Sequence, residues 1–335
     1  MTEKAEHPFA QYVRILARGR TISRALTQDE AREAMTMILA GDVEQVQLGA
    51  FLMLMRYKEE TPEEVAGFVE ACRSALVAPP DVTVDLDWSS YAGKRRQLPW
   101  FILSALLLAQ SGTRIFMHGT EGHTPGRMYT RETLEVMGLP VATTLAEAAE
   151  HIAATNFGYV PLEGLSPVLR EIIDLRPILG LRSPVHTIAR MINPLNAPAM
   201  LQGVFHPSYT ETHQIGLQLL GQSHMSVFKG EGGEIERRPN KPLVVKSLHD
   251  GVASEIEWPP LLPESRQPHD DDMDNGRLIA VWRGDIEDDY AVAAVTGTAA
   301  LALATMGRAS DPEDAQAQAT ALWQARDRGR LGAAA

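Results

Sequence analysis

The chain has 335 residues, of which 44% are hydrophobic and 22% charged, so it is long enough for two domains with large cores. Its formal net charge of −12 argues against a protein that binds polyanions over its whole surface. Its one cysteine, Cys72, excludes an internal disulfide, and neither a leader-like start nor a bilayer-length apolar run stands out. We therefore expect a cytoplasmic protein without a membrane partner.

The first part of the chain, residues 1–77, has the pattern of a helical domain. In "LTQDEAREAMTMILAGD", Thr27 is a candidate N-cap with Glu30 three residues later, and Gly41 stands where a helix would end. "TPEEVAGFVEACRSAL" begins with Thr61, followed by a proline and two acids, which is a strong helix start. The segment between them, "VEQVQLGAFLMLMRYK", is apolar nearly all round, which is typical of a helix inside a bundle.

Residues 78–335 alternate between strand-like and helix-like segments, which predicts an α/β domain. Residues 164–200 are helix-like and punctuated by prolines, and we expect them to pack on the helical domain. A final long helix is expected over 290–307. The predicted fold class is therefore α/β with a small all-helical N-terminal domain. The predicted strands lie in "VTVDLDW", "TRIFMHG", "FGYVPL", "MLQGVFH", "HMSVFKG" and "PLVVKSL".

A basic loop stands between the first predicted strand and the helix that follows it. "SSYAGKRRQLPW" places Lys94, Arg95 and Arg96 there, and residues 89–131 carry six basic residues against Glu121 alone. Free amides and the dipole at a helix N-terminus favour anions, so such loops commonly hold phosphates. Long cationic side chains would reach successive phosphates of an extended polymer. The alternative is a solvated run of charge.

Two further basic segments follow. Arg170, Arg176, Arg182 and Arg190 are spaced so that they could line a groove, or else form ion pairs with the acidic first domain. The charged segment 229–246 could contact phosphate or be a charged hairpin, and its cations include Lys229, Arg237 and Arg238. The histidines have no metal-ligand spacing, so we expect structural roles for His118, His186 and His206.

From about residue 20 to about residue 310, the order of segments resembles that of anthranilate phosphoribosyltransferase and its relatives. "GDVEQVQLGAFLMLMRYKEETPEEVAGF" is similar to the family's "GevsdaQigAFLmalrvKGeTpeEiaG". The resemblance implies a nucleoside phosphorylase/phosphoribosyltransferase-like architecture. In it, a helical domain forms the homodimer contact, and residues 78–335 resemble the glycosyltransferase family 3 domain.

The family's chemical motifs are mostly altered in this chain. The "LGxRT" element persists at residues 179–183, and Arg176 falls on the position of the family's arginine that holds the aromatic acid. The altered motifs are "GTGGD", now Tyr91, Ala92, Gly93, Lys94 and Arg95; "KHGN", now Met117, His118, Gly119 and Thr120; "GPLTNP", now residues 189–194; and the metal-holding "DE", now Glu234 and Ile235, with Glu236 one step further on.

These alterations resemble the YbiB-like branch of the family, which is described as keeping the fold and the homodimer while binding nucleic acid. The resemblance implies a non-catalytic protein that contacts the phosphate backbone of DNA or RNA without sequence specificity. It implies no catalytic residue, no cofactor and no metal. The expected phosphate-binding residues are Lys94, Arg95, Arg96, Arg176, Arg182 and Arg190, with a second set of Arg127, Lys229, Arg237 and Arg238.

Two other functions stay open on the sequence. One is a divergent glycosyltransferase or phosphoribosyltransferase that acts on an unknown acceptor. The other is a protein-interaction scaffold whose cations meet an acidic partner. The sequence has no helix-turn-helix, zinc-finger or RNP pattern, so nothing in it predicts readout of bases.

Overall fold

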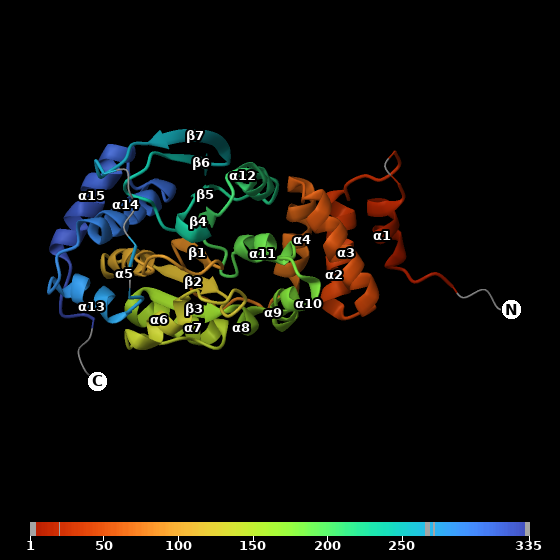
Figure 1. Ribbon diagram of the computed structural model, residues 1–335, viewed down its shortest axis with the longest axis horizontal. Helices are drawn as coiled ribbons and strands as arrows, with labels where there is room; N and C mark the ends of the chain where they lie inside the picture. Colours follow the sequence, from red (N-terminus) through yellow and green to blue (C-terminus); the bar gives the residue numbers. More distant parts are fainter. Residues whose placement is uncertain (1–4, 20, 265–268, 271, 332–335) are drawn as a thin grey trace.

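A bundle of helices at one end and a sheet flanked by helices at the other make up the protein, as the computed structural model shows (Figure 1). The structure describes residues 5–19, 21–264, 269–270 and 272–331. Within the described chain, the first helices form the bundle and the last ones lie on the far side of the sheet (Figure 1). This arrangement confirms the predicted fold class.

The bundle helices begin where the capping signals predict. The Thr27 hydroxyl accepts from the backbone N–H of Glu30, while the Glu30 carboxylate accepts from that of Thr27. Thr61 and Glu64 form the same reciprocal cap. Each cap satisfies backbone N–H groups that a first helical turn leaves free. The four helices are α1 (Ala10–Ala17), α2 (Gln28–Ala40), α3 (Gln45–Lys58) and α4 (Pro62–Ala75).

The third helix differs from its prediction. The sequence indicates a helix inside a bundle, and α3 does lie in the bundle, but it buries only one side, made of Leu48, Phe51, Leu52 and Met55. On its other side, Val46 is 84% exposed and Tyr57 is 91% exposed. A single chain therefore leaves an apolar helix face open to solvent.

A seven-stranded mixed sheet with the order β3-β2-β1-β4-β5-β6-β7 forms the centre of the second part. The first five strands in that order are parallel, and β5, β6 and β7 pair antiparallel. The sequence did not predict β7, although Asp250 and Gly251 form a left-handed turn between β6 and β7. The strands are β1 (Leu86–Ser90), β2 (Ile115–Gly119), β3 (Phe157–Pro161), β4 (Ala199–Val204), β5 (His224–Lys229), β6 (Leu243–His249) and β7 (Val252–Trp258).

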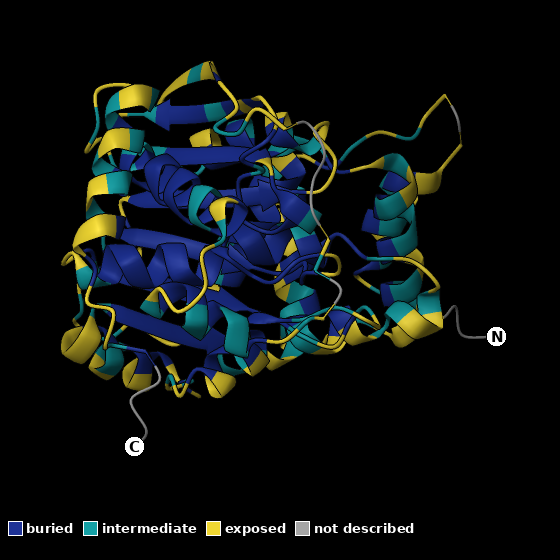
Figure 2. Cartoon of the chain, turned by 60° about the vertical axis from the view of Figure 1, so that its left-hand side comes forward, coloured by how far each residue is buried: buried dark blue, intermediate teal, exposed yellow. Residues whose placement is uncertain are grey.

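Each face of the sheet carries its own core. Successive side chains of a strand point to opposite faces, so in β4 Leu201 belongs to one core and Met200 to the other. The Leu201 core packs under α5 (Phe101–Gln110), α14 (Asp289–Thr305) and α15 (Pro312–Ala325). The Met200 core runs under α7 (Leu145–Thr155) and α12 (Tyr209–Leu219) and into the bundle. In Figure 2 the sheet is accordingly dark blue between more exposed helices.

The sequence missed two helices near the C-terminal end, α13 (Gly276–Arg283) and α15. The second has a clear start signal. Asp311 accepts hydrogen bonds from the N–H groups of Glu313 and Asp314, and Pro312 occupies the first helical position. The long helix expected over 290–307 is α14.

A string of short helices joins the sheet to the bundle. Ile188 and Met191 share a hydrophobic cluster with Phe51 of the bundle. Arg73 of α4 donates to the carbonyl oxygens of Met191 and Ile192. Because the cluster is continuous, the division at residue 77 stays a prediction. The remaining helices are α6 (Thr130–Val136), α8 (Leu162–Leu165), α9 (Pro167–Asp174), α10 (Arg176–Leu179), α11 (Val185–Ile188), η1 (Ala189–Met191) and η2 (Glu231–Gly233).

Within the described residues, no helix has both the length and the apolar character that a membrane crossing requires.

We predict that Gly67→Ala strongly destabilises the protein. Gly67 lies where α4 crosses α2, and an added Cβ would stand 2.1 Å from the carbonyl oxygen of Gln28. Backbone atoms cannot yield as a flexible side chain does, so we expect a loss of about 2–4 kcal/mol, measured as a lower urea midpoint. The matched control is Gly49→Ala in α3, whose Cβ would meet only Leu179 at 4.0 Å. The control should keep or raise the midpoint, and equal midpoints for the two variants would contradict the tight crossing.

Candidate functional site

The candidate site lies at the carboxyl ends of β1 and β4. These two strands are neighbours in the sheet, but the chain leaves β1 toward β2 on one side and enters β4 on the other. Such a topological switch point forms a crevice between the loops that follow the two strands. Here the crevice faces the bundle, and residues of the bundle close it.

Lys94 does not project from the basic loop, so its predicted exposure is wrong. Its side chain is 1% exposed, and its ammonium group forms an ion pair with the buried carboxylate of Glu236. Its backbone forms a two-way bridge with Met128. A buried lysine charge needs a counter-charge, and Glu236 supplies it. Of the predicted triplet, only Arg95 and Arg96 are exposed.

The loop amides after β1 already hold an anion from within the chain. One oxygen of the Glu234 carboxylate accepts from the backbone N–H of Ala92 at 2.7 Å and of Gly93 at 2.5 Å. Its other oxygen accepts from the Ser90 hydroxyl at 2.9 Å. Gly93 has a φ of 72°, in the left-handed region that favours glycine. The loop therefore retains a nest of donors for an anion, and Glu234 fills it.

Glu236 occupies the next anion position, at the start of α5. Its carboxylate accepts from the backbone N–H of Phe101 at 3.0 Å as well as from Lys94. Burial raises the pKa of Glu236 to about 7, while the neighbouring Lys94 ammonium acts in the opposite direction. We infer that the pair is ionised, because both hydrogen bonds of the carboxylate come from donors. The loop and the helix start are thus both neutralised by the chain's own acids.

The predicted cations of the second set lie in different environments. Arg127 donates to the carbonyl oxygens of Ala92, Gly93 and Gly232 and so braces the loop. Arg237 is 1% exposed, donates to the Pro259 carbonyl and stacks on Trp258, so its predicted role at the surface is wrong. Lys229 and Arg238 line a separate hollow beside Pro207, where the Arg238 guanidinium pairs with Glu231 at 2.8 Å.

Four arginines converge on the crevice, and we call Arg127, Arg176, Arg182 and Arg190 the arginine cluster. Arg176 and Arg182 both donate to the Thr124 hydroxyl, at 2.5 and 3.1 Å. Arg190 is buried, donates to the carbonyl of His186 and lies 5.7 Å from the Tyr91 ring centre. Within the described chain, every hydrogen bond that these four guanidinium groups donate goes to a neutral oxygen.

Within the described chain, no acid pairs directly with the four guanidinium groups of the cluster. Burial, and then the charges of the other three arginines, lower the pKa of Arg182 to about 10. Burial also lowers the pKa of Arg190, against the attraction of Glu234. Burial and the neighbouring positive charges both disfavour the charged guanidinium groups, and an anion bound beside them would offset these effects. Arg170, which the sequence grouped with these residues, pairs instead with Asp174 at 2.9 Å.

The histidines beside the cluster are held neutral. Burial, followed by the charge of Arg182, lowers the pKa of His123 to about 3, and burial lowers that of His186 well below its usual value. His118 is enclosed between the Tyr91 hydroxyl and Asp87. His206 lies on the exposed loop after β4. No cluster of potential metal ligands occurs among the residues that the structure describes.

Sequence reasoning missed three participants in the site. Arg56 and Glu60 reach the crevice from the bundle end of the chain, far from the motifs of the sheet. Glu234 was identified as the remnant of a metal-holding pair, but its role as the loop's internal anion was not predicted. The usable signal in the sequence was the pair of acids Glu234 and Glu236, together with a loop that keeps a glycine at position 93.

We predict that acidification destabilises the fold through its buried histidines. The pKa values of His123 and His213 are about 3, below the value of about 6.5 expected in an unfolded chain. The unfolded state therefore takes up protons first, and stability is lost as pH falls from about 6.5 toward about 3. Each histidine should contribute up to about 2 kcal/mol of the loss between about pH 7.5 and about pH 5, measured by urea unfolding.

The variant His213→Gln should show a smaller pH dependence, whatever its absolute stability. His206→Gln is the control, because it makes the same substitution at an exposed position on the loop after β4. A His213→Gln variant with the parent's full pH dependence would contradict the buried neutral imidazole.

Comparisons with known proteins identify relatives of this chain. Residues 10–76 match a model for the helical bundle domain of a glycosyl transferase family. An uncharacterized protein of Aquifex aeolicus is 30% identical over 231 residues, covering 68% of this chain and 70% of that protein. The anthranilate phosphoribosyltransferase of Deinococcus radiodurans is 30% identical over 233 residues, covering 68% of this chain and 67% of the enzyme.

Solved structures show the same fold. The crystal structure of anthranilate phosphoribosyltransferase from Thermus thermophilus aligns with a TM-score of 0.76 at 22% identity, covering 95% of this chain and 94% of that one. The enzyme of Saccharomyces cerevisiae in complex with PRPP and Mg aligns with a TM-score of 0.76 at 13% identity, covering 96% of this chain and 94% of that one. At these identities the likeness concerns the fold alone.

Proposed function

We propose, from the premise that the chain belongs to the anthranilate phosphoribosyltransferase-like family, that it is a non-catalytic homodimer that binds nucleic acid. It would contact the phosphate backbone without sequence specificity. The observation that carries the proposal is the arginine cluster, whose charges have no acidic hydrogen-bond partner in the described chain.

The internal carboxylates support the absence of transfer chemistry. Glu234 takes the loop amides, and Glu236 takes Lys94 and the start of α5. A pyrophosphate group would have to displace both acids, and each is buried with its hydrogen bonds satisfied. Transfer chemistry depends on holding pyrophosphate and metal in one geometry. The same acids leave the arginine cluster as the principal charge of the crevice.

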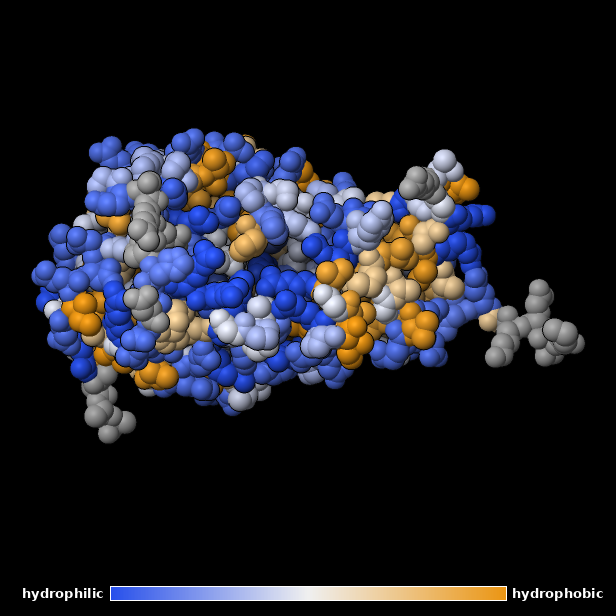
Figure 3. Space-filling model, viewed as in Figure 1, coloured by the Kyte–Doolittle hydropathy of each residue, from blue (hydrophilic) through white to orange (hydrophobic). Residues whose placement is uncertain are grey.

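The spread of the cations favours a polymer over one compact anion. Arg95 and Arg96 lie exposed on the loop after β1, whereas Arg182 and Arg190 of the arginine cluster line the pocket. Lys229 and Lys241 line a hollow on the side of Pro207. Figure 3 shows hydrophilic residues over the middle of this face, between the bundle and the sheet. Separated cations match the spaced charges of a phosphate backbone.

We predict that Arg176→Ala with Arg182→Ala weakens binding to unrelated oligonucleotides about equally. Each lost phosphate contact should flatten the slope of log affinity against log salt concentration by about 0.7 to 0.9. The matched control is Arg14→Ala with Arg32→Ala, which removes the same charge from exposed positions on the bundle. Fluorescence anisotropy at several salt concentrations measures both quantities for DNA and RNA.

Two results would contradict the proposal. One is a parent slope near zero, or equal slopes for the arginine variant and its control. The other is release of pyrophosphate from phosphoribosyl pyrophosphate in the presence of Mg²⁺ and an aromatic acceptor, which would favour the divergent transferase. Arg95→Ala with Arg96→Ala tests the loop separately, and Lys94 is left intact because its ion pair is internal.

The open face of α3 supports the homodimer. Val46 and Tyr57 project from it, and Ile178 of α10 is 80% exposed. Figure 3 shows apolar residues gathered over the bundle. A second copy with the same face would cover these side chains, since a two-fold contact pairs a patch with itself.

We predict that Val46→Asp with Tyr57→Asp converts the dimer to a monomer at micromolar concentration, because each copy would bury unpaired carboxylates. Sedimentation velocity measures the change. Val252→Asp, at a 68% exposed position of the edge strand β7, is the control and should leave the dimer intact. A parent that sediments as a monomer would contradict the dimer.

A further inference from the structure

We infer that a pocket at the floor of the crevice takes a phosphate monoester, the dianionic group found at the end of a nucleic-acid strand. The inference rests on the proposed function but goes beyond it, because backbone binding requires only internal phosphodiesters. It assigns to the pocket a preference for strand ends over the strand interior.

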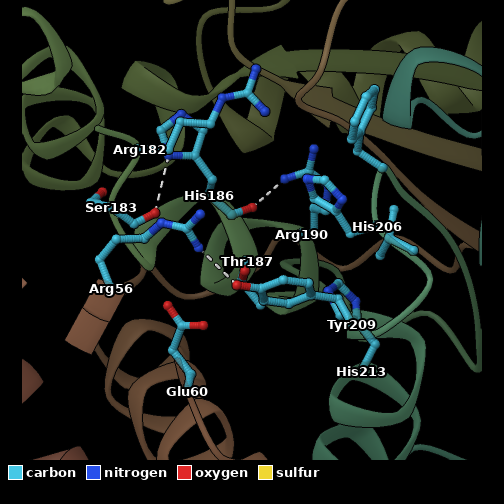
Figure 4. Close-up of a pocket in the computed structure, with 12 residues that line it drawn as sticks. Arg56, Glu60, Arg182, Ser183, His186, Thr187, Arg190, His206, Tyr209 and His213 are labelled. Atoms are coloured by element: carbon cyan, nitrogen blue, oxygen red, sulfur yellow. Dashed lines mark hydrogen bonds between the residues drawn. The ribbon is translucent and has the colours of Figure 1, made fainter. Parts of the chain in front are cut away.

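The pocket lies between the bundle and the sheet and has a volume of about 140 Å³ (Figure 4). This is close to the size of a cavity that holds one benzene molecule. A phosphodiester inside a strand would need an entrance and an exit for its two substituents. A terminal phosphate carries one substituent instead of two, so the small volume favours a strand end.

Three guanidinium groups line this volume. Arg56 donates to the Tyr209 hydroxyl at 2.8 Å, Arg190 to the His186 carbonyl, and Arg182 to the Thr124 hydroxyl at 3.1 Å. All three partners are neutral, and each guanidinium has five N–H donors, so donors remain for a ligand. Among the lining residues, Glu60 is the only acid, and it offsets Arg56 in part. The excess positive charge matches a dianion better than a monoanion.

The pocket also contains a buried acceptor with no partner. His186 is 6% exposed, and its Nδ1 lies 3.2 Å from the Ser183 carbonyl oxygen. A carbonyl oxygen only accepts, so Nδ1 carries the proton and Nε2 presents a lone pair. Within the described chain, Nε2 has no hydrogen-bond partner. A buried acceptor left unsatisfied costs free energy, and a donor from a ligand would remove that cost.

Glu60 supplies a second acceptor of the same kind. It is 7% exposed, and its Oε2 has no hydrogen-bond partner in the described chain. In Figure 4 its carboxylate points toward Arg56 and Tyr209. These acceptors would repel phosphate oxygens, so they suit O–H or N–H donors beside the phosphate. A sugar and base adjoining a terminal phosphate carry such donors.

Two sources offer this chemistry, a strand end and a free sugar phosphate, and the experiment separates them. One single-stranded oligonucleotide is prepared with a terminal phosphate and with a terminal hydroxyl, at either end. Anisotropy is measured in buffer without phosphate, with and without excess ribose 5-phosphate. We expect one phosphorylated form to bind about tenfold more tightly than its hydroxyl counterpart, and ribose 5-phosphate to abolish that difference.

The variant Arg56→Gln separates the pocket from the backbone site. Arg56 is not among the residues proposed for backbone contacts, so the variant should lose the tenfold preference while it binds the hydroxyl form as the parent does. Arg56→Lys keeps the charge and should retain part of the preference. Arg14→Gln is the control and should retain it in full. The melting temperature of each variant checks that it folds.

Equal affinity of the parent for all forms would overturn the pocket and leave backbone binding standing. A preference that survives in folded Arg56→Gln would overturn it as well. If no oligonucleotide binds, the proposed function is wrong. The pocket is then tested with ribose 5-phosphate alone, through the shift that it causes in the melting temperature. A thermal shift that Arg56→Gln abolishes would then support the pocket for a free monoester, and no shift would overturn it.

Discussion

Lys94 pairs with Glu236, and Glu234 accepts from the neighbouring loop amides. These contacts determine which groups of the crevice remain available to an external anion. A charge buried as deeply as these three is tolerated only with a partner, and removing one member of a buried pair typically costs about 3–5 kcal/mol. The carboxylates hold the loop after β1 against the segment that follows β5. The loop amides, which could otherwise bind an external anion, donate to a buried carboxylate of the same chain, so the loop is part of the core.

These internal contacts explain why the arginine cluster has no acidic hydrogen-bond partner. The acids nearest the loop are committed to its amides and to Lys94, so the arginine cluster donates to carbonyl and hydroxyl oxygens. Burial and then the neighbouring like charges lower the pKa of Arg182, so holding these groups together costs stability. Such a cost is characteristic of sites shaped for a ligand rather than for stability. The net charge of −12 does not weaken this reasoning, because it describes the whole chain, and Glu234 and Glu236 beside the crevice already accept from the loop amides, from Lys94 and from Phe101.

Local signals predicted much of the fold, and distant contacts decided what they could not. The caps at Thr27 and Thr61 act within one turn, so the sequence located α2 and α4 correctly. Lys94 was misplaced because its environment is set by Glu236, 142 residues further along the chain. A lysine followed by two arginines gives no sign of such a partner. The convergence of Arg176 and Arg182 on Thr124 is likewise a product of the folded chain.

The position of the pocket gives it a mechanical consequence. Arg56 and Glu60 come from the bundle, whereas Arg182, His186 and Arg190 come from the segment that joins it to the sheet. Guanidinium groups line the pocket on both sides, so a dianion between them would attract both sides at once. A ligand that binds both sides stabilises the arrangement in which both contact it, in proportion to its concentration over its dissociation constant. Phosphate at this point would therefore hold the bundle and the sheet together as one rigid support for the two-fold contact that we propose on α3.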